Sequence, residues 1–175
     1  MTTGTGQAWE ARRPQGFWRT FAEADLSKAD IIKGFIARYG DVNSKLPERS
    51  ALKDWQEVQD TLKVAALAYV APDANGVSHV TTDKALVDHA SVLGFPGEGT
   101  LHFDVTNEVV RGVGICPRAP SLATFMQMSA VQMIFERTPT RRCDECGHWF
   151  ALETTRAIYC SAACKSAAHR KMRAA

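Results

Sequence analysis

The sequence predicts an α+β protein, in which a mostly helical body with a small β-hairpin precedes a short cysteine-rich unit. Three observations support this fold class. Apolar residues recur at helical spacing in three long segments. Leu101, Phe103 and Val105 alternate with polar residues, as in a half-buried strand. Four of the five cysteines lie between Cys143 and Cys164, which indicates a separate small unit.

The first clear helix covers residues 31–39, whose apolar side chains fall on one stripe. Ser27 and Asp30 have the spacing of an N-terminal capping box. Gly40 suits the C-terminal end, because glycine tolerates the left-handed backbone that is common there. Residues 1–24 show no such period. We expect them to form a partly ordered N-terminal arm whose aromatic side chains pack in part on the body.

The helical body is expected to extend over residues 25–137. After the first helix we expect, in chain order, a helix that begins near Pro47 and ends before Pro72, a turn at Asn75-Gly76, a helix over 83–93, a hairpin over 100–115 and a helix over 121–137. The predicted core residues of the last helix are Leu122, Phe125, Met126, Met133, Ile134 and Phe135. Residues 138–140 are expected to be a short linker.

The four clustered cysteines have the spacing of zinc ligands. Two residues separate Cys143 from Cys146, three separate Cys160 from Cys164, and thirteen lie between the pairs. Zinc binds four ligands tetrahedrally and favours thiolates, so this pattern predicts one structural zinc ion per chain. Four thiolates fill the coordination shell and leave no position for water or a substrate. Cys116, the fifth cysteine, has no partner at ligand spacing and is interpreted as a small buried hydrophobe.

The residues around the cysteines predict a finger over residues 141–175. Gly147 suits the tight turn of a metal-binding knuckle. Ser161 suits the N-cap of a final helix that carries Cys164 in its first turn, where the helix dipole favours a thiolate. A knuckle, a hairpin and a ligand-bearing helix in this order are typical of a treble-clef finger. Its miniature core is expected to consist of Trp149, Phe150 and Tyr159.

Composition limits the location and the partners of the protein. No window of about 18 uncharged apolar residues is present, and the N-terminus lacks the pattern of a secretory signal. We therefore expect a cytoplasmic protein without a membrane partner, whose thiols stay reduced. Residues 137–175 contain eight Lys/Arg and three Asp/Glu, a net charge of +5, while the preceding residues have a net charge of −3. This asymmetry indicates an anionic partner for the C-terminal part.

The pattern RRCDECGHWF…YCSAACKSAAHRKMR, preceded by a helix that begins Pro120-Ser121-Leu122, resembles the CGNR-type zinc fingers of bacteria. Those fingers follow an ABATE-like helical domain. The resemblance covers residues 120–173 best and implies a stress-linked transcription regulator with the same four zinc ligands. After the fourth cysteine the family has Gly-Asn-Arg, whereas this chain has Lys165, Ser166 and Ala167. A DNA contact by that arginine therefore does not carry over.

The basic final helix is suited to contact nucleic acid. Lys165, His169 and Arg173 follow one another at four-residue spacing and share one helical face. The candidate nucleic-acid contacts are Arg141, Arg142, Arg156, Lys165, His169, Arg170, Lys171 and Arg173. DNA is the first expected partner and RNA the second. Because a single finger binds weakly, specific recognition calls for a homodimer or a second contact.

Two function classes stay open from the sequence. The first is a nucleic-acid-binding regulator whose body senses a ligand or mediates association. The second is a protein-interaction module, in which the finger is a structural staple and the basic helix is merely solvated. An enzyme is not expected, because residues 151–159 lack the histidine of a nuclease finger. The sequence also shows no Gly-rich phosphate loop, nucleophile elbow or paired-carboxylate site.

Overall fold

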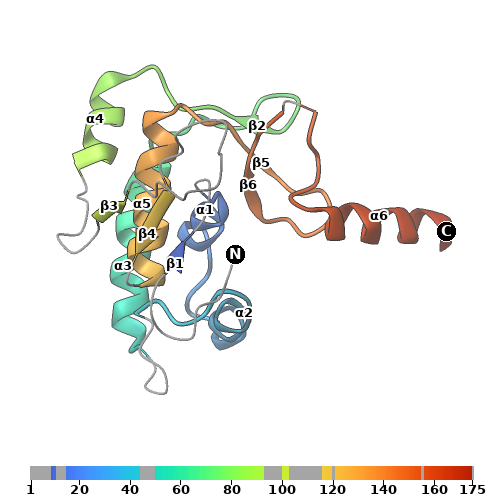
Figure 1. The fold of residues 1–175 in the computed structure, drawn as a ribbon, viewed down its shortest axis with the longest axis horizontal. Helices are drawn as coiled ribbons and strands as arrows, with labels where there is room; N and C mark the ends of the chain where they lie inside the picture. Colours follow the sequence, from blue (N-terminus) through green and yellow to red (C-terminus); the bar gives the residue numbers. More distant parts are fainter. Residues whose placement is uncertain are drawn as a thin grey trace.

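The computed structural model describes residues 9–10, 15–43, 50–92, 100–102, 116–119, 121–154 and 156–174. These residues form an α+β fold of helices and two small antiparallel sheets (Figure 1). In chain order the elements are β1 (Trp9–Glu10), α1 (Phe17–Ala22), α2 (Ala29–Tyr39), α3 (Leu52–Ala66), β2 (Val77–Ser78), α4 (Lys84–Val92), β3 (Thr100–His102), β4 (Cys116–Ala119), α5 (Leu122–Phe135), β5 (Thr140–Arg142), β6 (Trp149–Ala151) and α6 (Ala162–Ala174).

Helix α1 packs in the core of the body, although its residues belong to the segment that we expected to form an arm. Phe17, Trp18 and Phe21 are buried. The ring centroid of Phe21 lies 4.9 Å from that of Phe35 in α2 and 5.7 Å from that of Trp55 in α3. A helix of six residues is too short to produce a clear period in the sequence, which explains why the pattern did not predict it.

Helices α2 and α3 occur where their apolar stripes predicted them, but their ends differ from the predicted ones. Gly40 adopts φ 96° after α2, as expected. The predicted capping box is wrong, because Lys28 is the N-cap and the Ser27 hydroxyl donates to Asp25 Oδ1 (2.6 Å) instead. Helix α3 begins at Leu52, and the start expected near Pro47 lies outside the described residues. It ends at Ala66, before a turn that brings Tyr69 to a β-bridge with Val80.

Helix α5 is predominantly apolar without a single apolar stripe, and eleven of its 14 residues are buried, as suits a helix enclosed by other elements. Ser121 is its N-cap and accepts a hydrogen bond from the Thr124 backbone N–H (3.1 Å). Five of the six predicted core residues are buried. Phe135 is the exception, with 70% of its surface exposed, because it ends the helix just beyond the buried pair Met133 and Ile134.

The first sheet has the strand order β1-β4-β3. It confirms an antiparallel pair that begins at Thr100, but its second strand lies later than predicted. Residues 100–102 pair with 116–118, so Pro117 lies within β4 instead of separating a hairpin from α5. The predicted strand residues from Phe103 to Ile115 lie outside the described part of the chain. Cys116 faces His102 in this register.

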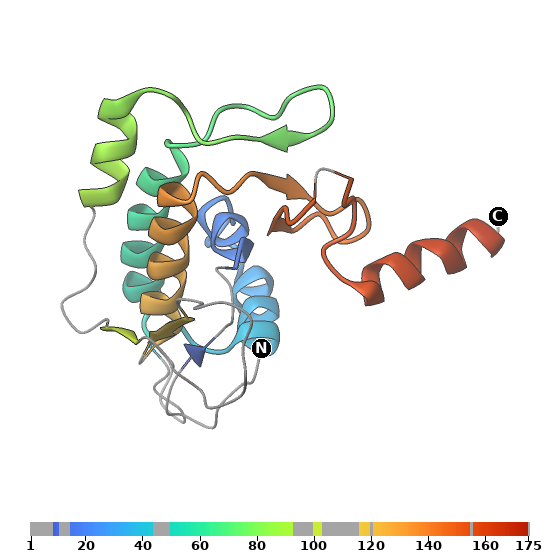
Figure 2. The same ribbon diagram turned by 45° about the horizontal axis from the view of Figure 1, so that its top comes forward.

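The second sheet joins the body to the cysteine-rich unit (Figure 2). Its order is β2-β5-β6, and Val77 and Ser78 of the body pair with Arg141 and Thr140. The segment expected to be a linker is therefore held in place. Thr140 is fully buried, and the Tyr69 hydroxyl donates to the carbonyl of Thr138 (3.1 Å).

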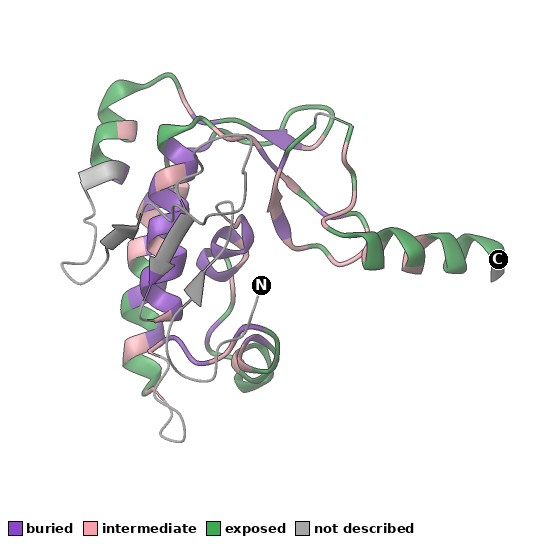
Figure 3. Ribbon diagram, viewed as in Figure 1, coloured by how far each residue is buried: buried purple, intermediate pink, exposed green. Residues whose placement is uncertain are grey.

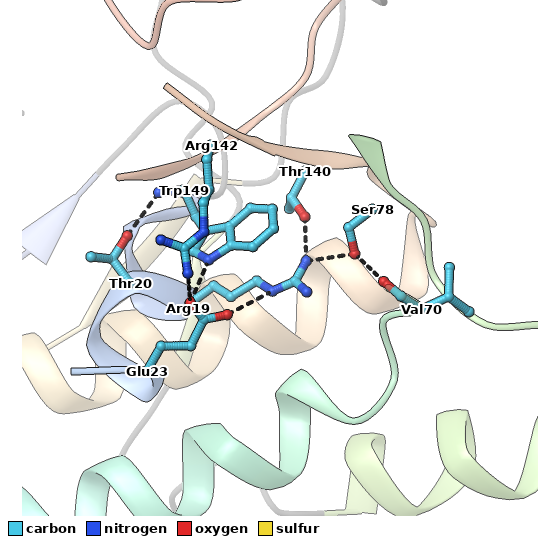
Figure 4. A network of polar contacts seen from close by, with 8 residues as sticks. All are labelled: Arg19, Thr20, Glu23, Val70, Ser78, Thr140, Arg142 and Trp149. Carbon is cyan, nitrogen blue, oxygen red and sulfur yellow. Dashed lines mark hydrogen bonds and ion pairs between the residues drawn. The ribbon is translucent and has the colours of Figure 1, made fainter. Parts of the chain in front are cut away.

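A polar network around Arg19 of α1 stabilises the same contact between the body and the cysteine-rich unit (Figure 4). Arg19 Nη1 donates to Ser78 Oγ (2.7 Å) and to Thr140 Oγ1 (2.6 Å). Its guanidinium carbon lies 3.8 Å from the ring centroid of Trp149 and 4.8 Å from that of Tyr69. Burial lowers the pKa of Arg19, although the nearby Glu23 carboxylate favours the charged form. The guanidinium of Arg19 in α1 thus contacts β2, β5 and β6 at once.

Trp149 packs against the body and not in a separate core of the finger as we had expected. Its Nε1 donates to Glu23 Oε2 (2.9 Å) and its backbone N–H donates to Thr20 Oγ1 (2.8 Å). Thr20 belongs to α1, and Glu23 is the C-cap of that helix. The contact is so close that a β-carbon at Gly16 would lie 2.7 Å from the backbone of Phe150 and Ala151.

Within the parts of the chain that the structure describes, no helix combines the length and the apolar character that crossing a membrane requires.

We expect Gly16→Ala to lower the free energy of unfolding by about 1–3 kcal/mol, because the added methyl group must displace the backbone of β6. Gly34→Ala is the matched control. A β-carbon at Gly34 meets nothing within 4 Å, and alanine stabilises a helix by about 0.5–1 kcal/mol relative to glycine. Urea unfolding of both variants measures the difference, and equal midpoints would contradict the close α1–β6 contact.

We also expect that a chain ending at Arg137 is less stable than the whole protein. Trp149 and Leu152 are buried, and removing large apolar side chains costs about 1.5–3 kcal/mol each. The deletion further exposes β2 and Arg19. Circular dichroism during thermal unfolding tests this, and a melting temperature like that of the full chain would show that the body folds independently.

Candidate metal centre

The first two cysteines lie on a knuckle between β5 and β6. Cys143 follows β5, and its backbone N–H donates to the carbonyl of His148 (2.9 Å). The Gly147 N–H donates to the carbonyl of Cys143 (2.8 Å), and Gly147 adopts φ 70°. This left-handed backbone suits glycine and allows the chain to turn within four residues. The knuckle thereby places Cys143 and Cys146 side by side.

The second pair of cysteines comes from the entrance of α6. Ser161 Oγ accepts a hydrogen bond from the Cys164 N–H (3.2 Å), which confirms Ser161 as the expected cap. The Cys160 N–H donates to Cys143 Sγ (3.4 Å) and so ties this entrance to the knuckle. Cys164 lies in the first turn of α6, where the positive end of the helix dipole favours a thiolate.

The four sulfur atoms converge on one point that fits a metal ion. All lie within 4.8 Å of one another. Cys160 Sγ lies 3.5 Å from Cys164 Sγ and 3.7 Å from Cys146 Sγ. Four metal–sulfur bonds of about 2.3 Å in a tetrahedron place the sulfur atoms about 3.8 Å apart. Cys143, Cys146, Cys160 and Cys164 thus form a site that is compatible with one structural metal ion.

The electrostatics of the thiols also favour a cation. Burial opposes ionisation of Cys143, but backbone N–H groups of Cys160, Cys146 and Glu145 outweigh it and lower the pKa of Cys143 to about 7. Burial and the neighbouring sulfur atoms raise the pKa of Cys160. Thiolates packed this closely repel one another, and a bound dication reverses that repulsion.

His148 connects the knuckle to the body. Its Nδ1 lies 3.3 Å from the hydroxyl of Tyr39 in α2, and it is half-buried. Burial and the nearby charge of Arg38 lower the pKa of His148. The sequence pattern did not predict this contact between His148 and Tyr39. No local sequence pattern indicates this contact, because the two residues are 109 positions apart.

Three of the eight basic residues that the sequence proposed as nucleic-acid contacts are held by carboxylates of the chain itself. Arg141 lies 3.5 Å from Asp144. Arg142 forms an ion pair with Glu23. Lys171 Nζ lies 2.5 Å from Glu145 Oε1. Of these three pairs, Arg142–Glu23 links the cysteine-rich unit to the body, and the other two join residues within that unit.

The other five basic residues are exposed and form no ion pair with any carboxylate that the structure describes. They are Arg156, Lys165, His169, Arg170 and Arg173. Helix α6, which carries four of them, extends away from the rest of the chain (Figure 1) and is exposed along most of its length (Figure 3). Lys165, Ser166, His169, Arg170 and Arg173 line one shallow hollow on it.

A groove of about 870 Å³ lies between α6 and the loop that follows β6. Arg156, Lys165 and His169 line the groove together with Ile158 and Met172, which are 37% and 65% exposed. The groove therefore combines basic side chains with apolar surface. Both features face the same side of the ligand-bearing helix.

Comparison with known proteins does not assign this site: no protein-family model, no curated protein and no solved structure matches the chain.

We expect one divalent metal ion per chain. Elemental analysis of protein purified without added metal measures the content, and a value near zero would contradict the site. Cys160→Ser should reduce metal binding sharply, because it removes one of four ligands. Ser161→Ala is a useful comparison, since it removes the helix cap and leaves every sulfur in place, so metal content should stay near one.

Proposed function

We propose that this chain is a zinc-finger nucleic-acid-binding protein of the bacterial transcription-regulator type, with DNA as the preferred partner and RNA as the second choice. The observation that carries the proposal is the helix α6, which is anchored at the four-cysteine site and extends into solvent with four basic side chains that form no ion pair with the described carboxylates. In this proposal residues 141–175 act as a treble-clef-like finger, and the protein binds a partner without acting as an enzyme.

The distribution of ion pairs supports an anionic partner. Arg141 and Arg142, which lie next to the body, have carboxylate partners, whereas Arg156 and four of the five basic side chains of α6 have none among the described residues. The only charged side chain of α6 with a carboxylate partner there is Lys171. Phosphate groups would supply the missing counter-charges, because Lys and Arg contacts to phosphates release bound counterions.

The shape of the finger supports the same proposal. An isolated helix of about 13 residues is only marginally stable in water. Helix α6 is held at its first turn by Cys164 and near its end by the Lys171–Glu145 pair, while its other face stays exposed. A helix about 10–12 Å wide fits the major groove of DNA.

Zinc is the metal that we propose for the site. Four thiolates at tetrahedral spacing suit zinc, which needs no redox partner and is structural when its shell is closed. Reduced thiolates accord with the expected cytoplasmic location. The resemblance to CGNR-type fingers that follow an ABATE-like domain adds the regulatory role. In such a regulator the body senses a ligand or mediates association, for example as a homodimer.

A protein-interaction module is the second candidate. The observation that favours it is the apolar surface of the groove beside α6, where Ile158 and Met172 are exposed. An acidic partner with apolar side chains would also match this groove.

The salt dependence of DNA binding tests the first candidate. Each lost phosphate contact should reduce the slope of log affinity against log salt by about 0.9 on duplex DNA. We expect the variant Lys165→Ala, Arg170→Ala, Arg173→Ala to bind a labelled duplex more weakly and with a slope that is smaller by about 2–3. Fluorescence anisotropy over a series of salt concentrations gives both quantities.

A matched control loses the same charge elsewhere. Lys33, Lys53 and Lys63 are exposed lysines of the body, and their joint replacement by Ala should leave the slope unchanged. If both triple variants lose affinity equally, binding reflects net charge and not the α6 face. If the parent binds neither DNA nor RNA at about 50 mM salt, where phosphate contacts are screened least, the interaction-module function replaces the regulator.

A further inference from the structure

A cleft of about 610 Å³ lies between helix α2 and the cysteine knuckle. One wall comes from α1 and α2, and the other comes from Arg142 and residues 146–149. Its volume lies in the range of about 300–1,000 Å³ that small-molecule sites occupy. Tyr39 and His148, which contact each other, both line the cleft. The cleft exists only because the finger is fastened to the body.

Because Gly34 has no side chain, the backbone of α2 is accessible from this cleft. It lies in the middle of the helix, where glycine is less stable than alanine, and a β-carbon there would meet nothing within 4 Å. Gly16 is different, because the close backbone of β6 requires it. At Gly34 no described residue accounts for the missing side chain. A flat molecule can therefore approach the helix backbone between Ile31, which is 42% exposed, and Arg38.

The acidic side chains that line the cleft already have partners. Glu23 pairs with Arg142 and accepts a hydrogen bond from Trp149. Asp25 lies 3.2 Å from Lys28, and Asp30 lies 3.5 Å from Lys33.

Arg38 is the charged group that remains. Its guanidinium carbon lies 5.3 Å from the ring centroid of Tyr39, and it forms no ion pair with a carboxylate of the described residues. A single unpaired guanidinium suits one carboxylate of a ligand, with which it makes bidentate hydrogen bonds. The three carboxylates in the lining disfavour a dianion such as a phosphate group.

We propose that this cleft binds a small organic acid that has one carboxylate and a flat apolar body. The carboxylate pairs with Arg38, and the apolar body lies on Gly34 and Ile31 of α2 and faces the knuckle. An inorganic anion is too small to fill the volume, so the apolar part supplies most of the contact. This site lies apart from the exposed face of α6, and the proposal does not depend on nucleic-acid binding.

The position of the cleft links such a ligand to the metal centre. Cys146 and His148 belong to its second wall, and Tyr39 and Arg38 belong to its first. A ligand that contacts both walls holds α2 and the knuckle at one separation. It therefore stabilises the arrangement in which the finger is attached to the body.

Benzoate is a suitable probe for the full-length, metal-loaded protein. Two-dimensional ¹⁵N–¹H NMR spectra resolve the glycine amides, and Gly34 and Gly147 report on the two walls. We expect both amides to shift on titration and to saturate. Arg38→Gln should weaken binding roughly ten-fold or more, since a hydrogen bond to a charged group is lost. Arg173→Gln removes the same charge from α6 and should leave benzoate binding unchanged.

Acetate and benzyl alcohol separate the two parts of the ligand. Acetate carries the charge without the apolar body, and benzyl alcohol carries the ring without the charge, so each should bind at least several-fold more weakly than benzoate. Gly34→Leu, which fills the bare helix face, should also weaken benzoate binding, whereas Gly34→Ala should bind more tightly than Gly34→Leu.

Four results would overturn the proposal. The first is that neither glycine amide shifts at about 10 mM benzoate, which is ten times a weak dissociation constant of about 1 mM. The others are acetate binding as tight as benzoate binding, an unchanged benzoate affinity in Arg38→Gln, and shifts that are confined to residues 165–173. Because no nucleic acid is present, the outcome is separate from the proposed function. A chain that binds benzoate and no DNA would support this site and contradict only the nucleic-acid proposal.

Discussion

The buried guanidinium of Arg19 is the contact on which the arrangement of the molecule depends. Its carbon lies 4.8 Å from the ring centroid of Tyr69 and 3.8 Å from that of Trp149, and the group donates to hydroxyls of β2 and β5. A planar group with several donors can stack on a ring and hydrogen-bond at its edge at the same time, which an ammonium group cannot do. Contacts to the body, at Ser78 and Tyr69, and to the cysteine-rich unit, at Thr140 and Trp149, therefore meet on one side chain.

The metal centre and the Arg19 network act on the two ends of the same β-hairpin. The sulfur atoms converge from the knuckle, at the turn of the hairpin, and from the entrance of α6. Arg19 donates to Thr140 at the open end of the hairpin and also contacts Trp149 next to the knuckle. With both ends held, α6 has a fixed direction away from the body (Figure 1). The same two attachments keep the knuckle beside α2 and leave the cleft between them.

Much of the local structure could be predicted from the sequence. The apolar stripe with Gly40 predicted α2, and the Ser121 cap with a long apolar run predicted α5. The cysteine spacing brought together the same four sulfur atoms that converge in the structure. The rest depended on distant partners. Helix α1 is too short for a period, and the pairing of β3 with β4 is set by a strand that contains Pro117.

The sequence by itself determined which residues can bind a metal and which helices have an apolar face, because both follow from spacing along a few turns of chain. Only the tertiary structure decided which basic residues pair with carboxylates of the chain and which stay exposed. In the sequence Arg142 and Lys171 look like Lys165 and Arg173. Their carboxylate partners lie 119 and 26 positions away, and folding alone brings such charges together. Trp149 was expected in the core of the finger, but in the tertiary structure its ring packs on the guanidinium of Arg19. The two residues are 130 positions apart in the chain, and their ring centroid and guanidinium carbon are 3.8 Å apart in space, so only folding brings them together.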